Sequence, residues 1–548
     1  MKSVVLLILD GFGISSETSG NAIAGAKKPY FDFIEKNFPF TLVQASGVLV
    51  GIPWGEPGNS EVGHIAIGTG QIWHQPLTRI TLAIQDGTFF QNPVLKKAAE
   101  HSREFKSDWH LVGLLGSGSV HSYIDHLYAL LEMGKNENIG KIWIHLFTDG
   151  RDSPPKESAT FIQNLTDRLK WLGAGEIATV IGRAYGMDRN SNWEKTKKAY
   201  DLITEGKGEP AADFVSAIKK QYSAGITDEF LEPIFLAPLK ARAFGMADAS
   251  GVLPLTGLAD ENGKPKCAVK DNDAVIFFNF REDRARQISR AFAKPDFAEF
   301  KTKPIKNLFT ATLVEYEKET NAKAIFPPPQ LKYYLSKILA ENGKTQFKTA
   351  ETEKYAHITY FFNGGREEIF EGEERKLIPS IPGGDFSKAP EMKACEITTE
   401  LVGAIKSGAY DFMLANFANP DMVGHTGDYN ATVKAIEVVD ESVGEIMKAA
   451  LENNCALIIT ADHGNAEQKI NPLTGEYQTE HTSNPVPVYL IMNELKREKT
   501  SSKIAELKNP DNVKGILQDV SATILDLMEI PAPADLDGES LLPILYKQ

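Results

Sequence analysis

The sequence has few cysteines and no long apolar segment. Only three of its 548 residues are cysteine, and they lie far apart, at Cys267, Cys395 and Cys455. With neither a CxxC pair nor a disulfide framework, the chain is expected to work in a reducing, cytoplasmic environment. The apolar run from Val4 to Leu9 ends at Asp10, so it is too short for a secretory signal or for the ~20 residues of a membrane span. We predict a buried strand there instead.

An excess of positive charge is also missing. The sequence has 73 acidic and 59 basic residues, a net charge of −14, and no basic run. Such a chain is not expected to bind nucleic acid or anionic membranes, although a local pocket can still bind a small anion. We find no internal repeat and no low-complexity tract. The composition, 42% hydrophobic and 24% charged, predicts a globular protein of about two to four domains.

Short runs of Val, Ile and Leu recur along the chain, and each is followed by polar residues. Near the two ends they are VVLLILDG, DFMLANFANPDMVGH and ALIITADHGN; in the middle they are HLVGLLGSGSVHS, KIWIHLFTDGRD, ATVIGRAYGMDR and AVIFFNFREDRAR. Continuous apolar runs are typical of parallel strands covered on both faces. Helical patterns lie between them, which predicts an α/β fold with mainly parallel central sheets. Ligands of such sheets bind at the carboxyl ends of the strands, where these polar residues fall.

The polar residues at these strand ends form two chemical sets. Aspartate and histidine, which suit Mn²⁺, Zn²⁺ or Mg²⁺, occur before about residue 75 and after about residue 350. Arginine, which binds carboxylate and phosphate oxygens, dominates between them. We therefore expect one α/β domain to be inserted into another, with crossings at the proline-containing stretches QPLTRI and FPPPQ. The prediction is a discontinuous metal-binding domain at 1–76 and 330–548, and an inserted anion-binding domain, including linkers, at 77–329.

Each candidate metal ligand also has a simpler interpretation. Asp10 is in a position where an aspartate often only caps a turn, and His481 could be a solvated loop histidine. The Asp462–His463 pair follows an apolar run, so burial would leave two polar groups unsatisfied unless something binds them. Taken together, the candidates predict a carboxylate–imidazole cluster for two metal ions, with a serine between them. Its members are Asp10, Ser60, Asp421, His425, Asp462, His463 and His481.

Ser60 lies in the stretch PGNSEVGHIAIGTG, which by itself could be an ordinary Gly-rich turn. The metal cluster favours a second interpretation. Two metal ions lower the pKa of a nearby hydroxyl and stabilise charge on attacking and leaving oxygens, while glycines let a phosphate approach the backbone. We therefore predict that Ser60 is a metal-activated nucleophile.

The basic residues also have a plain alternative. Arg281, Arg284 and Arg286 could form a solvated helix face, and Lys354, in ETEKYAH, could be a surface lysine. Against this, GRAYGMDR and TDGRD place further arginines directly after strands of the same segment. That arrangement favours an anion site.

Ten ordered motifs resemble one family. They are LILDGFG, GNSEVGH, HSYIDHL, DGRDSPP, GRAYGMDR, NFREDRARQ, ETEKYAHITYFFNGG, NPDMVGHTGD, TADHGNAE and EHTSNPVP. Along nearly its whole length the sequence is similar to the cofactor-independent (2,3-bisphosphoglycerate-independent) phosphoglycerate mutases of the alkaline phosphatase superfamily. The resemblance implies a phosphatase-like domain with two divalent metal ions and an inserted transferase domain. The metal expected is Mn²⁺, with Mg²⁺, Co²⁺ or Zn²⁺ as alternatives. It also implies a monomer.

The resemblance further implies roles for individual residues. Asp421, His425 and His481 match the ligands of one metal, and Asp10, Ser60, Asp462 and His463 match those of the other, with Ser60 as the phosphorylated serine. The residues that match the substrate-binding set are His121, Arg151, Asp152, Arg183, Arg189, Arg281, Arg284 and Lys354. The implied reaction interconverts 3-phosphoglycerate and 2-phosphoglycerate in glycolysis and gluconeogenesis. Lys354 is expected to stabilise the transferring phosphoryl group, and Asp152 to shuttle protons.

Four stretches depart from the family pattern, around Trp54, Trp73, Asn262 and Ser380. They leave the proposed site residues intact. Two other functions stay open at this point. One is a metal-dependent hydrolase or a phosphopentomutase-like enzyme of the same superfamily, against which the Arg-rich middle segment argues. The other is a catalytically inactive binding or scaffold protein, against which the intact serine and metal-type residues argue.

Overall fold

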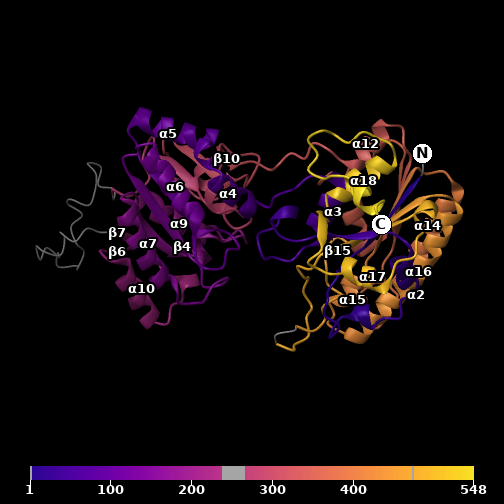
Figure 1. Ribbon diagram of the computed structural model, residues 1–548. Helices are drawn as coiled ribbons and strands as arrows, with labels where there is room; N and C mark the ends of the chain where they lie inside the picture. The colour runs from indigo at the N-terminus through magenta and orange to yellow at the C-terminus, as the bar shows by residue number, and fades with distance from the viewer. Residues whose placement is uncertain (1–2, 237–265, 472–473) are drawn as a thin grey trace, which may run out of the picture. The chain divides into compact units, whose positions relative to one another are not determined.

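A computed structural model describes residues 3–236, 266–471 and 474–548. The chain forms two compact units, each built around its own eight-stranded sheet (Figure 1). Unit 1 comprises residues 1–78 and 330–548, and unit 2 comprises residues 79–329. The stretch around Asn262 that departs from the family pattern lies outside the described residues.

The sheet of unit 1 combines strands from both ends of the sequence. Its order is β12-β11-β13-β1-β14-β15-β2-β16, and only β15 runs antiparallel to its neighbours. The strands are β1 (Val4–Leu9), β2 (Phe40–Gln44), β11 (Gln346–Glu351), β12 (Glu373–Ile378), β13 (Phe412–Phe417), β14 (Ala456–Thr460), β15 (Val486–Ile491) and β16 (Val513–Ile516). The strand β1 lies at the centre, where Val4 is in register with Phe412 on one side and Ala456 on the other.

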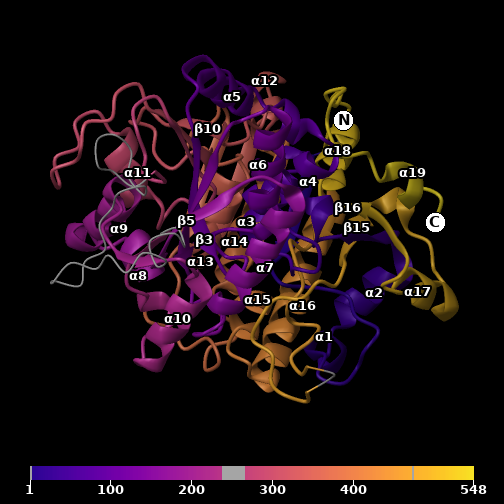
Figure 2. The same ribbon diagram turned by 90° about the vertical axis from the view of Figure 1, so that its left-hand side faces the viewer.

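Helices cover both faces of this sheet. They are α1 (Ala22–Gly25), α2 (Pro29–Asn37), α3 (Ser60–Thr69), α12 (Leu335–Glu341), α13 (Thr352–Ala356), α14 (Ala394–Ser407), α15 (Asn419–Gly424), α16 (Tyr429–Glu452), α17 (Ser501–Leu507), α18 (Asp519–Leu527) and α19 (Leu542–Leu545). The long helix α16 packs against α1, α2, α14 and α15 (Figure 2). Helix α3 packs against α12, α18 and a π-helical turn, His357–Phe361, that directly follows α13.

Unit 2 has the same kind of sheet with the order β10-β9-β8-β3-β4-β5-β7-β6, in which only β5 and β7 pair antiparallel. The strands are β3 (Trp109–Leu115), β4 (Ile142–Thr148), β5 (Glu176–Gly182), β6 (Glu209–Ala211), β7 (Ile234–Leu236), β8 (Ala274–Phe277), β9 (Phe309–Val314) and β10 (Lys323–Phe326). The helices are α4 (Pro76–Gln85), α5 (Pro93–Phe105), α6 (Ile124–Asn136), α7 (Ser158–Leu172), α8 (Arg183–Gly186), α9 (Trp193–Glu205), α10 (Phe214–Ser223) and α11 (Arg286–Ala293).

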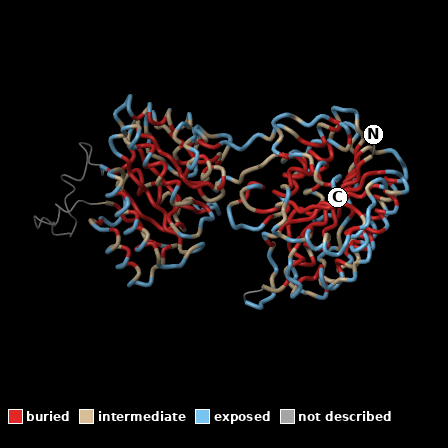
Figure 3. Tube along the Cα trace, in the orientation of Figure 1, coloured by how far each residue is buried: buried red, intermediate tan, exposed pale blue. Residues whose placement is uncertain are grey.

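Burial follows the strands in both units (Figure 3). Every residue of β1, β3, β4, β13 and β14 is buried. These are the continuous apolar runs of the sequence, and they are covered by helices on both faces, as parallel strands require. The α/β fold with mainly parallel sheets and the buried strand at Val4–Leu9 are thus confirmed. Among the residues described, none of the helices combines the length and the apolar character that crossing a membrane would require.

Candidate functional site

The acidic candidates of unit 1 meet at one edge of its sheet. Asp10 directly follows β1, Asp421 lies in α15 just after β13, and Asp462 and His463 follow β14. These three strands are adjacent and parallel, so their carboxyl ends lie side by side. All four side chains are buried. The alternative of an isolated turn-capping aspartate therefore does not describe Asp10.

Ser60 is the first residue of α3, and the Gly-rich segment around it allows a close approach to the acids. The Asn59 side chain caps the helix by accepting a hydrogen bond from the backbone N–H of Val62 at 3.0 Å. A Cβ at Gly63 would lie 2.5 Å from the carbonyl oxygen of Asp462, so only glycine permits this packing. As a result Ser60 Oγ lies 3.2 Å from Asp10 Oδ1 and 3.0 Å from His463 Nε2.

Lys354 lies in the middle of this cluster and is buried, so the surface-lysine alternative is wrong. It sits in α13, just after β11, and its Nζ donates to Asp10 Oδ1 at 2.6 Å, Asp421 Oδ2 at 2.8 Å and Ser60 Oγ at 2.8 Å. Burial alone would lower the pKa of this ammonium group. The carboxylates of Asp10, Asp421 and Asp462 outweigh burial and raise it.

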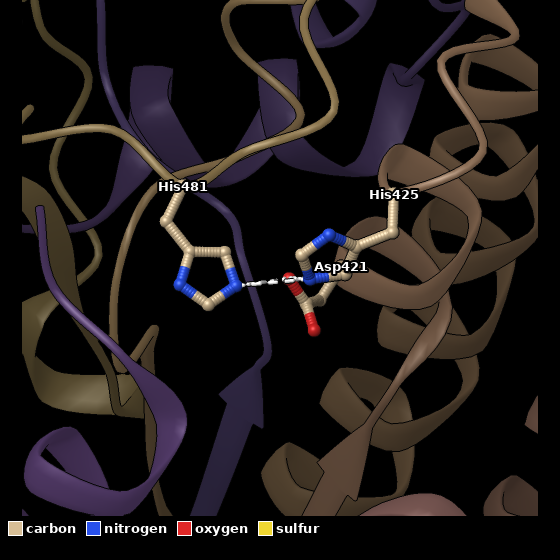
Figure 4. A group of neighbouring side chains, drawn as sticks. All are labelled: Asp421, His425 and His481. Carbon is tan, nitrogen blue, oxygen red and sulfur yellow. Dashed lines mark hydrogen bonds and ion pairs between the residues drawn. The ribbon is translucent and has the colours of Figure 1, made fainter. Parts of the chain in front are cut away.

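One candidate metal group consists of Asp421, His425 and His481, which converge from α15 and from the loop before β15 (Figure 4). The Nε2 atoms of the two histidines are 3.0 Å apart, and each is 3.2 Å from Asp421 Oδ1. Their Nδ1 atoms face backbone carbonyls, that of Thr479 at 2.7 Å and that of Gly58 at 2.9 Å. A carbonyl only accepts hydrogen bonds, so in a neutral ring Nδ1 carries the hydrogen and Nε2 presents a lone pair. Two lone pairs and a carboxylate oxygen directed at one point fit a divalent cation.

The second candidate group is fully buried and consists of Asp10, Asp462 and His463 next to Ser60. His463 Nε2 lies 3.5 Å from both Asp10 Oδ1 and Asp462 Oδ2, and Asp462 Oδ2 has no hydrogen-bond donor. Burial, and then the charge of Asp462, raise the pKa of Asp10. For Asp462, burial is outweighed by His463 and other positive neighbours, which lower its pKa. Oxygen and imidazole donors gathered around an unpartnered buried carboxylate oxygen also fit a divalent metal ion.

In unit 2 the predicted residues gather at the carboxyl ends of β3, β4 and β5. Arg183 is buried and donates to Asp149 and, at 2.6 Å, to Asp152 Oδ2. Burial raises the pKa of Asp152, but the hydrogen bond and charge of Arg183, together with the charges of His121 and Arg284, outweigh burial and lower it. His121 lies with Nε2 3.6 Å from Asp152 and Nδ1 3.4 Å from Asp283. Burial and the charge of Arg183 lower the pKa of His121 to about 4.

Three other predicted arginines of unit 2 are exposed to solvent. The side chains of Arg151, Arg189 and Arg281 are 50%, 51% and 52% exposed. Burial, and then the like charges of Arg189, Arg183 and Arg151, lower the pKa of Arg284, which places these cations close together. Crowded cations facing solvent favour an anionic ligand. The helix-face alternative is wrong for Arg281 and Arg284, because α11 begins only at Arg286.

Several polar residues that contact these groups or their partners were not predicted from the sequence. In unit 1 they are His64, Asn416, Asn465 and Lys469; in unit 2 they are Asp149 and Asp283. The two acids could have been found, since each stands within three residues of a predicted arginine. His64 is the last residue of GNSEVGH, four residues after Ser60 and thus on the same side of α3. The sequence gives no comparable signal for Asn416, which lies inside the apolar run of β13.

Known proteins resemble this chain along nearly its whole length. The model of the Metalloenzyme superfamily matches residues 2–532. A 2,3-bisphosphoglycerate-independent phosphoglycerate mutase of Clostridium botulinum is 44% identical over 99% of both chains. One of Methanosarcina barkeri is 42% identical over 99% of this chain and 98% of its own. A crystal structure of Leishmania mexicana phosphoglycerate mutase at low cobalt concentration is 30% identical, with a TM-score of 0.54 over 98% of this chain and 97% of its own. The chain therefore belongs to the 2,3-bisphosphoglycerate-independent phosphoglycerate mutases, which are isomerases of the metalloenzyme superfamily.

Proposed function

We propose that the protein interconverts 3-phosphoglycerate and 2-phosphoglycerate through a phosphoserine on Ser60, with two divalent metal ions and without 2,3-bisphosphoglycerate. The reaction is a step of glycolysis and gluconeogenesis. The observation that carries the proposal is the position of Ser60 Oγ, which is within hydrogen-bond distance of an acid, an imidazole and an ammonium group at once. A serine that only ended a turn would need none of these partners.

The residues around Ser60 suit the formation of a nucleophile. Ser60 Oγ donates to Asp10 Oδ1, and Lys354 donates to Ser60 Oγ. Asp10 Oδ1 accepts the hydrogen bond from this hydroxyl and is therefore placed to take its proton. Lys354 keeps its proton and stabilises negative charge on Oγ as the hydroxyl loses its hydrogen. Oγ then attacks phosphorus in line, and the bond from phosphorus to the glycerate oxygen breaks.

Two divalent metal ions would be held by the two groups of unit 1, and Mn²⁺ is the metal we propose. Asp421, His425 and His481 would bind one ion, and Asp10, Ser60, Asp462 and His463 the other. When bound, these ions lower the pKa of the serine hydroxyl and neutralise charge on the phosphoryl oxygens. Three of the ligands, Asp10, Asp462 and His463, are completely buried, which limits the access of water to that side of Ser60.

The residues of unit 2 would bind and orient the glycerate part. The half-exposed guanidinium groups of Arg151, Arg189 and Arg281 are suited to a carboxylate and to phosphate oxygens. Asp152 would accept a proton from the glycerate hydroxyl that attacks and return one to the oxygen that leaves. Its lowered pKa makes it hold that proton only briefly. Arg183, which donates to both Asp149 and Asp152, would keep the Asp152 carboxylate in place.

The proposal is tested with metal-stripped protein and 3-phosphoglycerate, in the absence of 2,3-bisphosphoglycerate. We expect 2-phosphoglycerate to appear only after Mn²⁺ is added. Release of inorganic phosphate without 2-phosphoglycerate would instead indicate a hydrolase built on the same residues. If neither product forms with Mn²⁺, Mg²⁺, Co²⁺ or Zn²⁺, the proposed substrate is wrong.

A further inference from the structure

His64 lies directly beneath Ser60, and none of the roles above uses it. The side chain is completely buried, and it sits one helical turn after Ser60 in α3. A completely buried histidine is expected only where both ring nitrogens find partners. The groups found near them are the backbone of the nucleophile, one candidate metal ligand and Asn416.

The hydrogen-bond partners assign the tautomer of His64. Its Nδ1 lies 2.8 Å from the backbone carbonyl oxygen of Ser60 and 3.2 Å from Asp462 Oδ2, and both of these atoms accept. The hydrogen is therefore on Nδ1. His64 Nε2 lies 3.0 Å from the amide nitrogen of Asn416, which only donates, so Nε2 is the acceptor. Each ring nitrogen thus has a hydrogen-bond partner.

Asn416 extends this connection to a second acid. The same amide nitrogen donates to Asp10 Oδ2 at 2.9 Å. Its two hydrogens are thus divided between Asp10 and His64, which fixes the amide orientation. The result is a continuous chain of hydrogen bonds from Asp10 through Asn416 and His64 to the Ser60 carbonyl, and His64 Nδ1 also lies 3.2 Å from Asp462 Oδ2. These contacts tie the ends of β1, β13 and β14 to the first turn of α3.

This arrangement also argues against a ligand role for His64. The ring lies near Asp10 and Asp462, as a third metal ligand would. Its Nδ1, however, is blocked by the hydrogen that it donates to the Ser60 carbonyl, and its Nε2 receives the Asn416 amide. Neither nitrogen has a lone pair directed at the acids.

We propose that His64 and Asn416 are positioning residues that hold the Ser60 backbone and the Asp10 and Asp462 carboxylates in the arrangement that a metal ion and the reaction require. The inference rests on the proposed function. Partners of this kind, one layer behind metal ligands, affect metal affinity or activity by about 10- to 100-fold.

Paired substitutions separate positioning from simple packing. In His64→Asn the side-chain amide nitrogen takes the place of Nδ1, so the donor to the Ser60 carbonyl is kept. In His64→Gln the side chain is one methylene group longer than in His64→Asn. Its amide therefore lies near the position of Nε2, and the donor at the position of Nδ1 is lost. His64→Leu removes both groups. His145→Gln, a replacement of another completely buried histidine in β4 of unit 2, is the matched control for the loss of a buried imidazole.

Four quantities are measured for each variant: Mn²⁺ affinity of the metal-stripped protein by calorimetry, kcat and KM for 3-phosphoglycerate, and the melting temperature. We expect the Gln and Leu variants at position 64 to lose about 10- to 100-fold in Mn²⁺ affinity and in kcat, with KM changed less than about threefold. We expect His64→Asn to stay near the wild-type values, and His145→Gln to lower the melting temperature but not Mn²⁺ affinity.

Two results would overturn the inference. One is equal loss in His64→Asn and His64→Gln; the other is a loss that follows the melting temperature across all variants, His145→Gln included. The calorimetric readout does not depend on turnover. If the wild type showed no mutase activity, the proposed function would fail while the positioning role was still decided by Mn²⁺ affinity.

Discussion

Most of the charged side chains at the two candidate sites differ in exposure. In unit 1 the side chains of Asp10, Asp462 and His463 have no exposed surface, and the acids are paired with Lys354 and histidines. In unit 2 the guanidinium groups of Arg151 and Arg281 are about half exposed and lie more than 3.4 Å from the nearest acid.

This difference in exposure suits two different tasks, which are stabilising charge on a reacting oxygen and capturing an anion from solvent. A buried, internally paired cluster is preorganised, so little rearrangement is needed when charge develops on a reacting oxygen. An open group of arginines attracts an anion from solvent and exchanges it readily. Phosphoryl transfer is thus expected to depend on the fixed geometry of unit 1, and substrate capture on the free charge of unit 2.

The strongest test of this division is Ser60→Ala. Without Oγ no phosphoserine can form, so we expect no detectable conversion of 3-phosphoglycerate. Calorimetry should still detect Mn²⁺ binding, because the carboxylates and imidazoles remain. Ser521→Ala, at another buried serine in α18, is the control and should retain activity. Turnover by the Ser60 variant would refute the phosphoserine scheme.

Removing one positive charge from each unit should have very different effects on stability. Lys354→Met leaves buried carboxylates without their ammonium partner, and breaking such a pair costs about 3–5 kcal/mol. Arg281→Met removes a half-exposed charge and should change the free energy of unfolding by less than about 0.5 kcal/mol. Urea unfolding of the metal-stripped proteins measures both values. Similar values for the two variants would contradict the comparison.

Mild acid should also distinguish the units. Burial lowers the pKa of His126 to about 3 and that of His145 well below the ordinary 6.5, and both residues belong to unit 2. The folded state then binds fewer protons than the unfolded state, so stability is lost as pH falls below 6.5, by about 1.4 kcal/mol per pH unit for each histidine.

In unit 1, Glu351 has the opposite effect of pH on stability. Burial raises the pKa of this carboxyl group to about 7. Its ionisation destabilises the folded state above that pH, and this cost disappears as pH falls from about 7 to 4.5. Burial also lowers the pKa of His357 in unit 1 to about 3, so this unit loses some stability at low pH as well, and Glu351 partly offsets that loss. Hydrogen exchange at pH 7 and pH 5, corrected for intrinsic rates, should therefore show faster opening of β3 and β4 at the lower pH and a smaller change in β1 and β13. Glu351→Gln should remove the stabilisation that Glu351 gives to unit 1 as the pH falls from 7 to 5.

The smallest effect is expected for single arginines of unit 2. Arg281→Ala removes a charged hydrogen-bond donor worth about 1.5–3 kcal/mol, which corresponds to a loss of about 10- to 150-fold in kcat/KM, mainly through KM. Arg168→Ala is the control, because this arginine of α7 stacks on Trp171. If the Arg281 variant had unchanged kinetics, the residue would be only a solvated surface charge.

The strands, and the polar residues at their carboxyl ends, could be predicted from the sequence because both depend on local patterns. Continuous apolar runs such as VVLLIL become parallel strands, and the polar residue that ends each run lies at the carboxyl edge. The clustering of Asp10, Asp421 and Asp462 follows from strand adjacency alone.

Burial and hydrogen-bond partners could not be read in the same way. Lys354 stands in a polar stretch that looks exposed, and its burial depends on acids from β1 and α15. The bond between His64 and Asn416 joins residues 352 positions apart, and no local pattern reports it. Arg281 and Arg284 are spaced as on a helix, but the helix starts after them.

The central position of β1 has a consequence for synthesis on the ribosome. Both neighbours of this strand, β13 and β14, lie more than 400 residues later in the chain. At 5–20 residues per second, β1 waits about 20–80 s for its first partner. Unit 2 is continuous in sequence and completes its own sheet during that interval. Six consecutive apolar residues at the N-terminus thus stay unpaired for most of translation, which makes the nascent chain a natural client for chaperones.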